Sequence, residues 1–182
     1  MDYPSEWQTE FTDKNGKKVV FRPEQSSDLE MLWEMFSTLS KESASNLLPP
    51  FTRERVEGWT SNIDYNEVLT IVAVVDEENM QRIIGSASLK FNKPQALAHK
   101  AELAITVHDN YQNVGIGTAL LEHLIGIART KKLTKLHLDV STTNERAIHV
   151  YKSAGFSIEA KLCNESIVNG KYRDEYRMAL FL

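Results

Sequence analysis

The residues best suited to chemistry form a glycine-containing run that joins an apolar strand to an amphipathic helix. The run is Gln112, Asn113, Val114, Gly115, Ile116, Gly117 and Thr118. Glycines at such a junction let the backbone turn tightly and approach a ligand closely. The free N–H groups of the first helical turn, together with the helix dipole, form a site for a phosphate group. A strand-to-helix turn that binds no ligand also uses glycines, so both interpretations stay open at this point.

Three known phosphate-binding patterns do not fit this run. A P-loop has Gly-Lys before its Ser or Thr, whereas Gly117 is followed directly by Thr118. A dinucleotide fingerprint has a third glycine where this chain has Leu120. A kinase glycine loop needs a downstream catalytic loop with metal ligands, and the sequence has neither. A nucleotide-binding enzyme built on the same turn remains an alternative.

A second signature follows downstream, in the pattern N-x-x-A-x-x-x-Y-x-x-x-G-F. It is formed by Asn144, Ala147, Tyr151, Gly155 and Phe156. The first run, in its strand-to-helix context, resembles the acyl-CoA motif of the GNAT superfamily of N-acetyltransferases. The downstream pattern resembles the second signature of that family. The resemblance covers residues 101–156, and residues 173–180 are similar to the closing strand of the family.

The resemblance implies acetyl-CoA as acyl donor. The family splays two strands apart, here residues 101–107 and 135–140, and the pantetheine arm lies between them. Backbone groups of Ile105 and Val107 would pair with pantetheine as an added strand does. The run from Gln112 to Thr118 would hold the pyrophosphate, and the Asn144 amide would bond the pantetheine arm.

This chain departs from the family inside the phosphate loop. Many relatives carry basic residues there, whereas this chain has Asn113 and Val114. Phosphate affinity would then depend more on backbone N–H groups and on other cations. Lys152 is one candidate for such a cation.

Two side chains are predicted to act on the reacting groups. An amine with a pKa of about 10.4 is mostly charged at neutral pH and must lose a proton before it attacks a thioester. Glu102 is the candidate base, because protein-acetylating relatives place a catalytic Glu on this strand. Tyr151 matches the family position for the proton donor to the leaving thiolate, and the Val107 N–H would bind the carbonyl oxygen. The structural alternatives are a solvent-facing Glu102 and a core Tyr151.

Neither a metal site nor an acyl-enzyme is predicted. The five histidines have no metal-ligand spacing, and the single cysteine, Cys163, is interpreted as a small buried apolar residue. We therefore expect direct attack of the acceptor amine in a ternary complex, without a metal.

The surrounding elements favour an α/β (α+β) fold. Apolar and alternating runs predict strands at 17–22, 68–75, 82–91, 101–107, 135–140, 156–168 and 172–182. Helices are predicted at 29–39, capped by Asp28, at about 52–59, at 117–130 and at 142–154. The order indicates one GNAT-like domain, residues 17–182, with a central, mixed, mostly antiparallel sheet flanked by helices. Residues 1–16 are predicted to be an N-terminal extension, and residues 47–51 a lid over the acceptor.

Composition limits the location and the partners. The chain has 182 residues and a net charge of −4, which argues against a general nucleic-acid binder. One cysteine excludes an internal disulfide and fits a reducing compartment, so a cytoplasmic protein without membrane association is expected. The partner would be a small-molecule or protein amine. Asn169 and Gly170 predict a two-residue turn between the last two strands. Exposed edges of this C-terminal hairpin are compatible with a homodimer.

One functional alternative belongs to a different class. A non-catalytic acyl-CoA-binding sensor on the same fold would show the same two signatures, because a fold does not determine function. Substitution of Tyr151 separates the two, since a sensor would keep its binding and have no turnover to lose.

Overall fold

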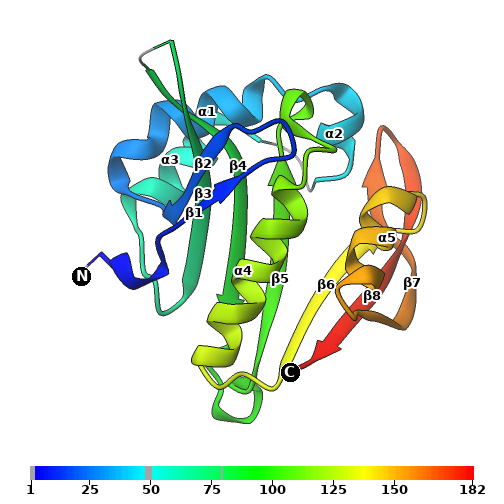
Figure 1. Ribbon diagram of the computed structural model, residues 1–182. Helices are drawn as coiled ribbons and strands as arrows, with labels where there is room; N and C mark the ends of the chain where they lie inside the picture. Colours follow the sequence, from blue (N-terminus) through cyan, green and yellow to red (C-terminus); the bar gives the residue numbers. More distant parts are fainter. Residues whose placement is uncertain (1–2, 48–50, 79) are drawn as a thin grey trace.

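The computed structural model describes residues 3–47, 51–78 and 80–182, and Figure 1 shows their arrangement. The described strands form one eight-stranded sheet in the order β1-β2-β3-β4-β5-β6-β8-β7. The strands are β1 (Thr9–Thr12), β2 (Lys18–Pro23), β3 (Val68–Glu77), β4 (Met80–Phe91), β5 (Lys100–Val107), β6 (Lys135–Ser141), β7 (Ser157–Val168) and β8 (Lys171–Phe181). The helices are α1 (Leu29–Ser37), α2 (Lys41–Ser45), α3 (Arg53–Ser61), α4 (Ile116–Thr130) and α5 (Glu145–Ser153), with short 3-10 turns at Ser5–Trp7, Ser26–Asp28, Gln95–Leu97 and Asp109–Tyr111.

The sheet is mixed and mostly antiparallel, as predicted. Among the described strands, β5 and β6 form the parallel pair, and all other neighbours run antiparallel. Asn169 and Gly170 both have positive φ, 52° and 75°, and make the expected two-residue turn between β7 and β8. The β3–β4 register shifts between Ala73 and Val74, next to Gly85, which pairs with Ala73.

The first strand, β1, is an element that the sequence did not indicate. It pairs with β2 from Thr9↔Phe21 to Thr12↔Lys18. The Asp13 carboxylate closes the turn between them by accepting hydrogen bonds from the backbone N–H groups of Asn15 and Lys17, each at 2.8 Å. β1 is therefore an edge strand of the sheet. The domain boundary placed between residues 16 and 17 stays a prediction.

The helix ends confirm one predicted start and correct one predicted cap. Helix α3 begins next to Thr52, as predicted, and the Thr52 hydroxyl caps it by accepting from Arg55 N. The prediction that Asp28 caps α1 is wrong, because its side chain makes no cap bond to that helix. Its carboxylate instead accepts from both terminal nitrogens of Arg22, each at 2.7 Å, and from Gln25 N.

The helices cover the two faces of the sheet unequally. The face with α4 and α5 carries the larger core, which includes Leu120, Leu121 and Leu124 of α4. The opposite face carries a smaller core, in which Leu32 of α1 and Val56 of α3 pack on β3 and β4. Figure 1 shows α4 and α5 in front of the sheet, with α1 and α3 behind it. Much of the second face is thus left open beyond α1 and α3.

The parallel strands β5 and β6 diverge after a short stretch of pairing. Their register runs from Lys100↔Lys135 through Ala101↔Leu136 to Glu102↔His137 and stops there. Beyond Glu102, β5 continues to Val107 and β6 to Ser141 without pairing to each other. The backbone groups of both strands that face this opening are therefore available to a ligand, as the predicted splay requires.

Candidate active site

The glycine-containing run opens α4 by means of a left-handed residue. Gly115 has φ 96° and is the N-cap of α4, without a side-chain cap bond. Because a helix leaves its first N–H groups without internal partners, those of Ile116, Gly117 and Thr118 are free to bind an anion. Gly117 is close to Val107, since a Cβ on Gly117 would lie 3.6 Å from that side chain. The run therefore has the geometry of an anion cradle beside the end of β5.

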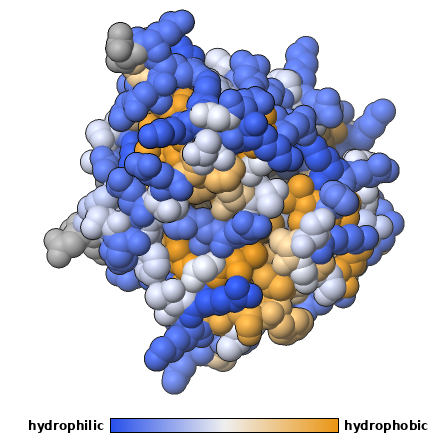
Figure 2. Space-filling model, viewed as in Figure 1, coloured by the Kyte–Doolittle hydropathy of each residue, from blue (hydrophilic) through white to orange (hydrophobic). Residues whose placement is uncertain are grey.

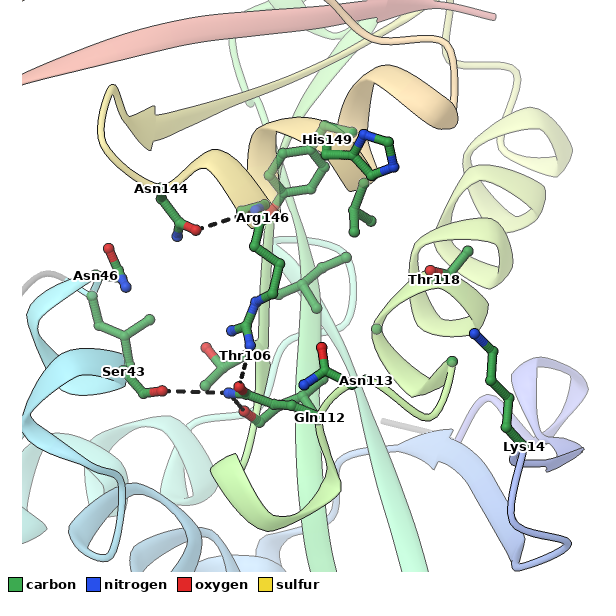
Figure 3. A pocket seen from close by; sticks show the side chains of 18 residues that line it. Lys14, Ser43, Asn46, Thr106, Gln112, Asn113, Thr118, Asn144, Arg146 and His149 are labelled. Atoms are coloured by element: carbon green, nitrogen blue, oxygen red, sulfur yellow. Dashed lines mark hydrogen bonds between the residues drawn. The ribbon is translucent and has the colours of Figure 1, made fainter.

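A lysine of the N-terminal hairpin, Lys14, lies beside the loop. Lys14 N donates to Val114 O at 3.1 Å, which fixes the hairpin turn against the loop. Its side chain lies beside Gly115, and Figure 3 shows it directed toward the first turn of α4. The sequence suggested Lys152 for this role, but Lys152 does not line the cavity described below, whereas Lys14 does. Lys14 lies about a hundred residues before the loop, so only the pairing of β1 with β2 brings the two together.

The backbone of β5 presents alternate residues to the opening. His108 N donates to Ile84 O on β4 at 2.9 Å, so the groups of His108 point away from β6. Because successive residues of a strand alternate in direction, the N–H and C=O groups of Val107 and Ile105 point toward the opening. These are the residues predicted to pair with pantetheine and to bind the carbonyl oxygen.

The Gln112 side chain links α2, β5 and α5 at this opening. Its amide nitrogen donates to Val107 O at 2.9 Å and to Ser43 Oγ at 3.3 Å, and its amide oxygen accepts from Arg146 of α5. Figure 3 shows these bonds meeting at the Gln112 amide. Ser43 is in turn held by Asp109, which also accepts from Ser40. Although burial opposes the change, these hydrogen bonds lower the pKa of Asp109 to about 2, so it stays ionised at neutral pH.

The first cavity lies between α4 and α5 and has a volume of about 400 Å³. Its lining includes most of the predicted cofactor residues: Ile105, Val107, Gln112, Asn113, Gly115, Gly117, Thr118, Asn144 and Tyr151. The other two, Val114 and Ile116, turn their side chains toward the core, so only their backbone groups could meet a ligand there. Arg146 and His149 also line it and were not predicted. Figure 2 shows apolar residues gathered along the middle of this face, as a binding groove for an aliphatic arm requires.

Asn144 and Tyr151 belong to α5 and its cap. The Asn144 side-chain oxygen accepts from Ala147 N at 3.1 Å and so caps the helix, which leaves its NH₂ group for a ligand. The ring of Tyr151 packs against Phe156 at 5.8 Å between centroids. Burial raises the pKa of Tyr151 to about 12, so its hydroxyl keeps its proton at neutral pH. Tyr151 also borders a second cavity, which lies on the opposite face of the sheet.

The second cavity is larger, about 710 Å³, and meets the first at the middle of β5 and α5. Both are lined by Asn46, Leu47, Ile105, Thr106, Asn144, Ala147 and Tyr151. Among the described residues, the carboxylates that line the second cavity are Glu24, Asp64, Glu67, Glu102, Asp139, Glu165 and Glu175, and the cations are Arg55, Lys90 and Arg173. Acidic groups therefore predominate, which favours a cationic ligand.

Glu102 faces this second cavity, together with Ala104 and Thr106, as strand alternation predicted. Its side chain is exposed and makes no hydrogen bond or ion pair with another described residue. A carboxylate in that position is free to take a proton from a bound ammonium group.

An aromatic wall closes part of the second cavity. Phe36 stacks on Phe51 at 5.0 Å, and Trp59 meets both rings edge-on. The Arg55 guanidinium lies 5.4 Å and 5.5 Å from the ring centres of Phe51 and Trp59. Leu47 and Phe51, the ends of the predicted lid, both line this cavity, while residues 48–50 lie outside the described residues.

Other candidate groups lie outside the two cavities. Cys163 is exposed on the edge strand β7, so the prediction that it is buried is wrong, because that strand has no packed layer over either face there. His108 bonds Thr38 and Asn110 and lines neither cavity.

No group of three His, Cys, Asp or Glu suited to a metal occurs in the part of the chain that the structure describes. In that same part, no helix is long and apolar enough to cross a membrane.

An acyl-coenzyme A molecule would fit the joined cavities. Its phosphates would lie at the start of α4, its pantetheine arm between β5 and β6, and its acyl group near Tyr151. The model of the Acetyltransferase (GNAT) family matches residues 30–156. The chain therefore belongs to the GNAT acetyltransferase family.

The relatives and solved structures that resemble the chain agree with this assignment. Spermidine N(1)-acetyltransferase of Escherichia coli K12 is 39% identical over 83 residues, which are 45% of this chain and 45% of that protein. The chain thus matches less than half the length of that curated relative. The GNAT domain of S. lividans PAT has a TM-score of 0.79 with 23% identity and full coverage of both chains. A Salmonella typhimurium protein solved with its cofactor acetyl-CoA has a TM-score of 0.74 with 20% identity, covering 90% of this chain and 94% of that one.

Proposed function

We propose that the protein transfers an acetyl group from acetyl-CoA to an amine, by direct attack in a ternary complex. The observation that carries this proposal is the meeting of two cavities at Tyr151, one bordered by the α4 anion cradle and the other by carboxylates. Family membership and the fold support the same reaction class. A binding sensor would need the first cavity alone, so the second cavity favours a transferase.

The residues that would hold acetyl-CoA are those of the first cavity. The N–H groups at the start of α4 and the Lys14 ammonium would bind the phosphates. The backbone groups of Ile105 and the Asn144 NH₂ would bond the pantetheine arm. Acetyl-CoA supplies the activated acyl group as a thioester, and no metal is needed for that chemistry. Arg146, which now bonds Gln112 across the opening, would exchange that bond for contact with the ligand.

Three groups of this chain would act during the transfer. Glu102 accepts the proton of the acceptor ammonium, directly or through water. The Val107 N–H donates a hydrogen bond to the carbonyl oxygen, on which negative charge develops. The Tyr151 hydroxyl donates a hydrogen bond to the leaving sulfur. A thiol has a pKa of about 8.5, well below the value of about 12 for Tyr151, so Tyr151 stabilises the thiolate without giving up its proton completely.

The test begins with calorimetric titration of acetyl-CoA into the purified protein, with ATP and NAD as controls. Saturable binding of acetyl-CoA alone is expected. Thiol release is then followed with spermidine, an L-amino acid and a peptide amine as acceptors. If a folded sample binds no acetyl-CoA, the run from Gln112 to Thr118 is structural and the proposal is withdrawn.

Location and assembly are part of the proposal. A single exposed thiol, Cys163, supports a reducing compartment such as the cytoplasm. Strand β7 is an edge strand of the sheet, like β1 at the other end. Exposed apolar side chains lie on or beside β7, namely Ile158, Ile167 and Tyr172. These features support a homodimer, which sedimentation at several protein concentrations tests.

A further inference from the structure

Glu24 is a buried carboxylate for which the proposed reaction has no use. It follows β2 directly, and only 5% of its surface is exposed. Its backbone N–H bonds Thr70 O at 2.9 Å, and its backbone oxygen accepts from the Tyr65 hydroxyl at 2.8 Å. Its Oε1 atom, in contrast, is fully buried and has no hydrogen-bond partner among the described residues. A buried carboxylate oxygen without a donor is rare, and it indicates a missing partner.

Within residues 3–47, 51–78 and 80–182, no cation forms an ion pair with Glu24. The nearby Arg22 is bound by both oxygens of Asp28, so that pair is already neutral. Burial raises the pKa of Glu24 to about 7, against a side-chain hydrogen bond with Thr70 and the attraction of Arg22 that lower it. A bound cation would favour the ionised form of the carboxyl group.

The Glu24 side chain borders the second cavity, which Tyr151 also borders. Three other carboxylates of that cavity are neutralised by partners, as Glu67 pairs with Lys93, Asp139 with Arg177 and Glu175 with Arg173. Glu24 and Glu102 form no ion pair with any described residue. Asp64 and Glu165 also line the cavity without a described ion pair. Of these four carboxylates Glu24 is the buried one, and it is remote from the proposed reaction centre at Glu102.

The sheet fixes the separation of these two places. Glu24 lies beside Thr70 of β3, Thr70 pairs with Ser88 of β4, and Ser88 pairs with Ala104 of β5. Three strand spacings separate Glu24 from Ala104, which corresponds to roughly 14 Å between their backbones. Glu24 and Ala104 line the same cavity, so two nitrogens bound at these two places would lie on the order of 10–15 Å apart.

We propose that Glu24 is a specificity-determining residue that binds a second cationic group of the acceptor, so that the preferred acceptors are diamines or longer polyamines. This inference rests on the proposed function, because it takes the second cavity as the acceptor site. One amine is acetylated beside Tyr151 while the distant ammonium is paired with the Glu24 carboxylate.

Direct binding tests the inference without relying on turnover. Unbranched diamines of increasing length, each matched with the monoamine of equal length, are titrated calorimetrically into the protein saturated with coenzyme A. Wild type is expected to bind the diamine of best-fitting length about tenfold to a hundredfold more tightly than its monoamine. Glu24→Gln keeps the shape but not the charge and should reduce that ratio to near one, with monoamine affinity unchanged.

Two further variants make the test specific. Glu122→Gln removes an exposed carboxylate of α4, on the opposite face of the sheet, and should keep the wild-type ratio. Glu24→Asp keeps the charge but withdraws it by one methylene, so the best-fitting diamine should become longer. The inference is overturned if wild type does not prefer diamines, or if Glu24→Gln keeps the preference. Acetylation of the diamines and of the monoamines is measured separately, and its absence for both in wild type contradicts the proposed function rather than the role of Glu24.

Discussion

The buried carboxyl of Glu24 should lower the free energy of unfolding as the pH rises, and Glu24→Gln should remove this contribution. Its pKa rises from 4.5 to about 7 on folding, mainly because burial disfavours the charged form. The folded state therefore keeps a proton that the unfolded chain releases between these two values. The stabilisation from the neutral carboxyl is complete below pH 4.5 and is lost as the pH rises toward 7. The difference between the two pKa values corresponds to about 3 kcal/mol.

The measurement is urea unfolding of wild type and Glu24→Gln at pH 5 and pH 8, followed by circular dichroism. Other groups also titrate in this range, so the informative quantity is the difference between the two proteins. Relative to wild type, Glu24→Gln should gain roughly 2.5 kcal/mol in unfolding free energy between pH 5 and pH 8. Glu122→Gln, with an exposed carboxylate, should follow wild type at both values. Parallel behaviour of wild type and Glu24→Gln would refute the reasoning, because Glu24 would then be as well solvated when folded as when unfolded.

Three other substitutions test the cofactor side of the site. Tyr151→Phe should lower kcat on the order of 10²-fold, with the KM for acetyl-CoA unchanged, because it removes a donor that is needed when the thiolate forms; equal kcat would assign Tyr151 to packing alone. Lys14→Gln should raise the KM for acetyl-CoA roughly fivefold at low salt and less at high salt, since an exposed charge is screened; dephospho-coenzyme A, titrated in parallel, shows which phosphate Lys14 meets. Gly115→Ala should weaken acetyl-CoA binding and cost about 1–3 kcal/mol of stability, because φ is 96° there and a Cβ would lie 3.5 Å from Phe11; unchanged calorimetric affinity and melting temperature would contradict this.

Most of the fold followed from local signals in the sequence. Alternating or continuous apolar runs predicted seven of the described strands, and Asn169-Gly170 predicted the last hairpin turn. The strand that was not predicted, β1, is short and polar, with mostly exposed residues, so it has no apolar periodicity. Asp28 illustrates a different limit. A helix cap depends on local sequence, but a buried arginine partner such as Arg22 can bind the same carboxylate.

The candidate site was predictable where a motif spans consecutive residues. Nine of the predicted cofactor residues line the first cavity, because a strand, a turn and a helix start fix their relative positions. Lys14, Arg146 and Glu24 were not predicted for either cavity. Lys14 depends on a hairpin that pairs far from the loop, and Glu24 depends on the alignment of β2, β3, β4 and β5. No sequence spacing indicates Lys14 or Glu24. Glu24 is recognised only in the structure, by its burial and by its Oε1 atom without a hydrogen-bond partner among the described residues.

The short pairing of β5 with β6 leaves the two halves of the sheet connected at one end of these strands and separate at the other. The strands β6, β8 and β7 are joined to the rest of the sheet by three residue pairs at one end, with α5 following β6 on the same side. This junction is a natural hinge, and a ligand lying between the diverging strands would connect the two halves along the rest of their length. Acetyl-CoA would then serve as a removable structural strand. Amide hydrogen exchange in β6 should slow when it binds, and the two halves of the sheet should gain cooperativity in unfolding.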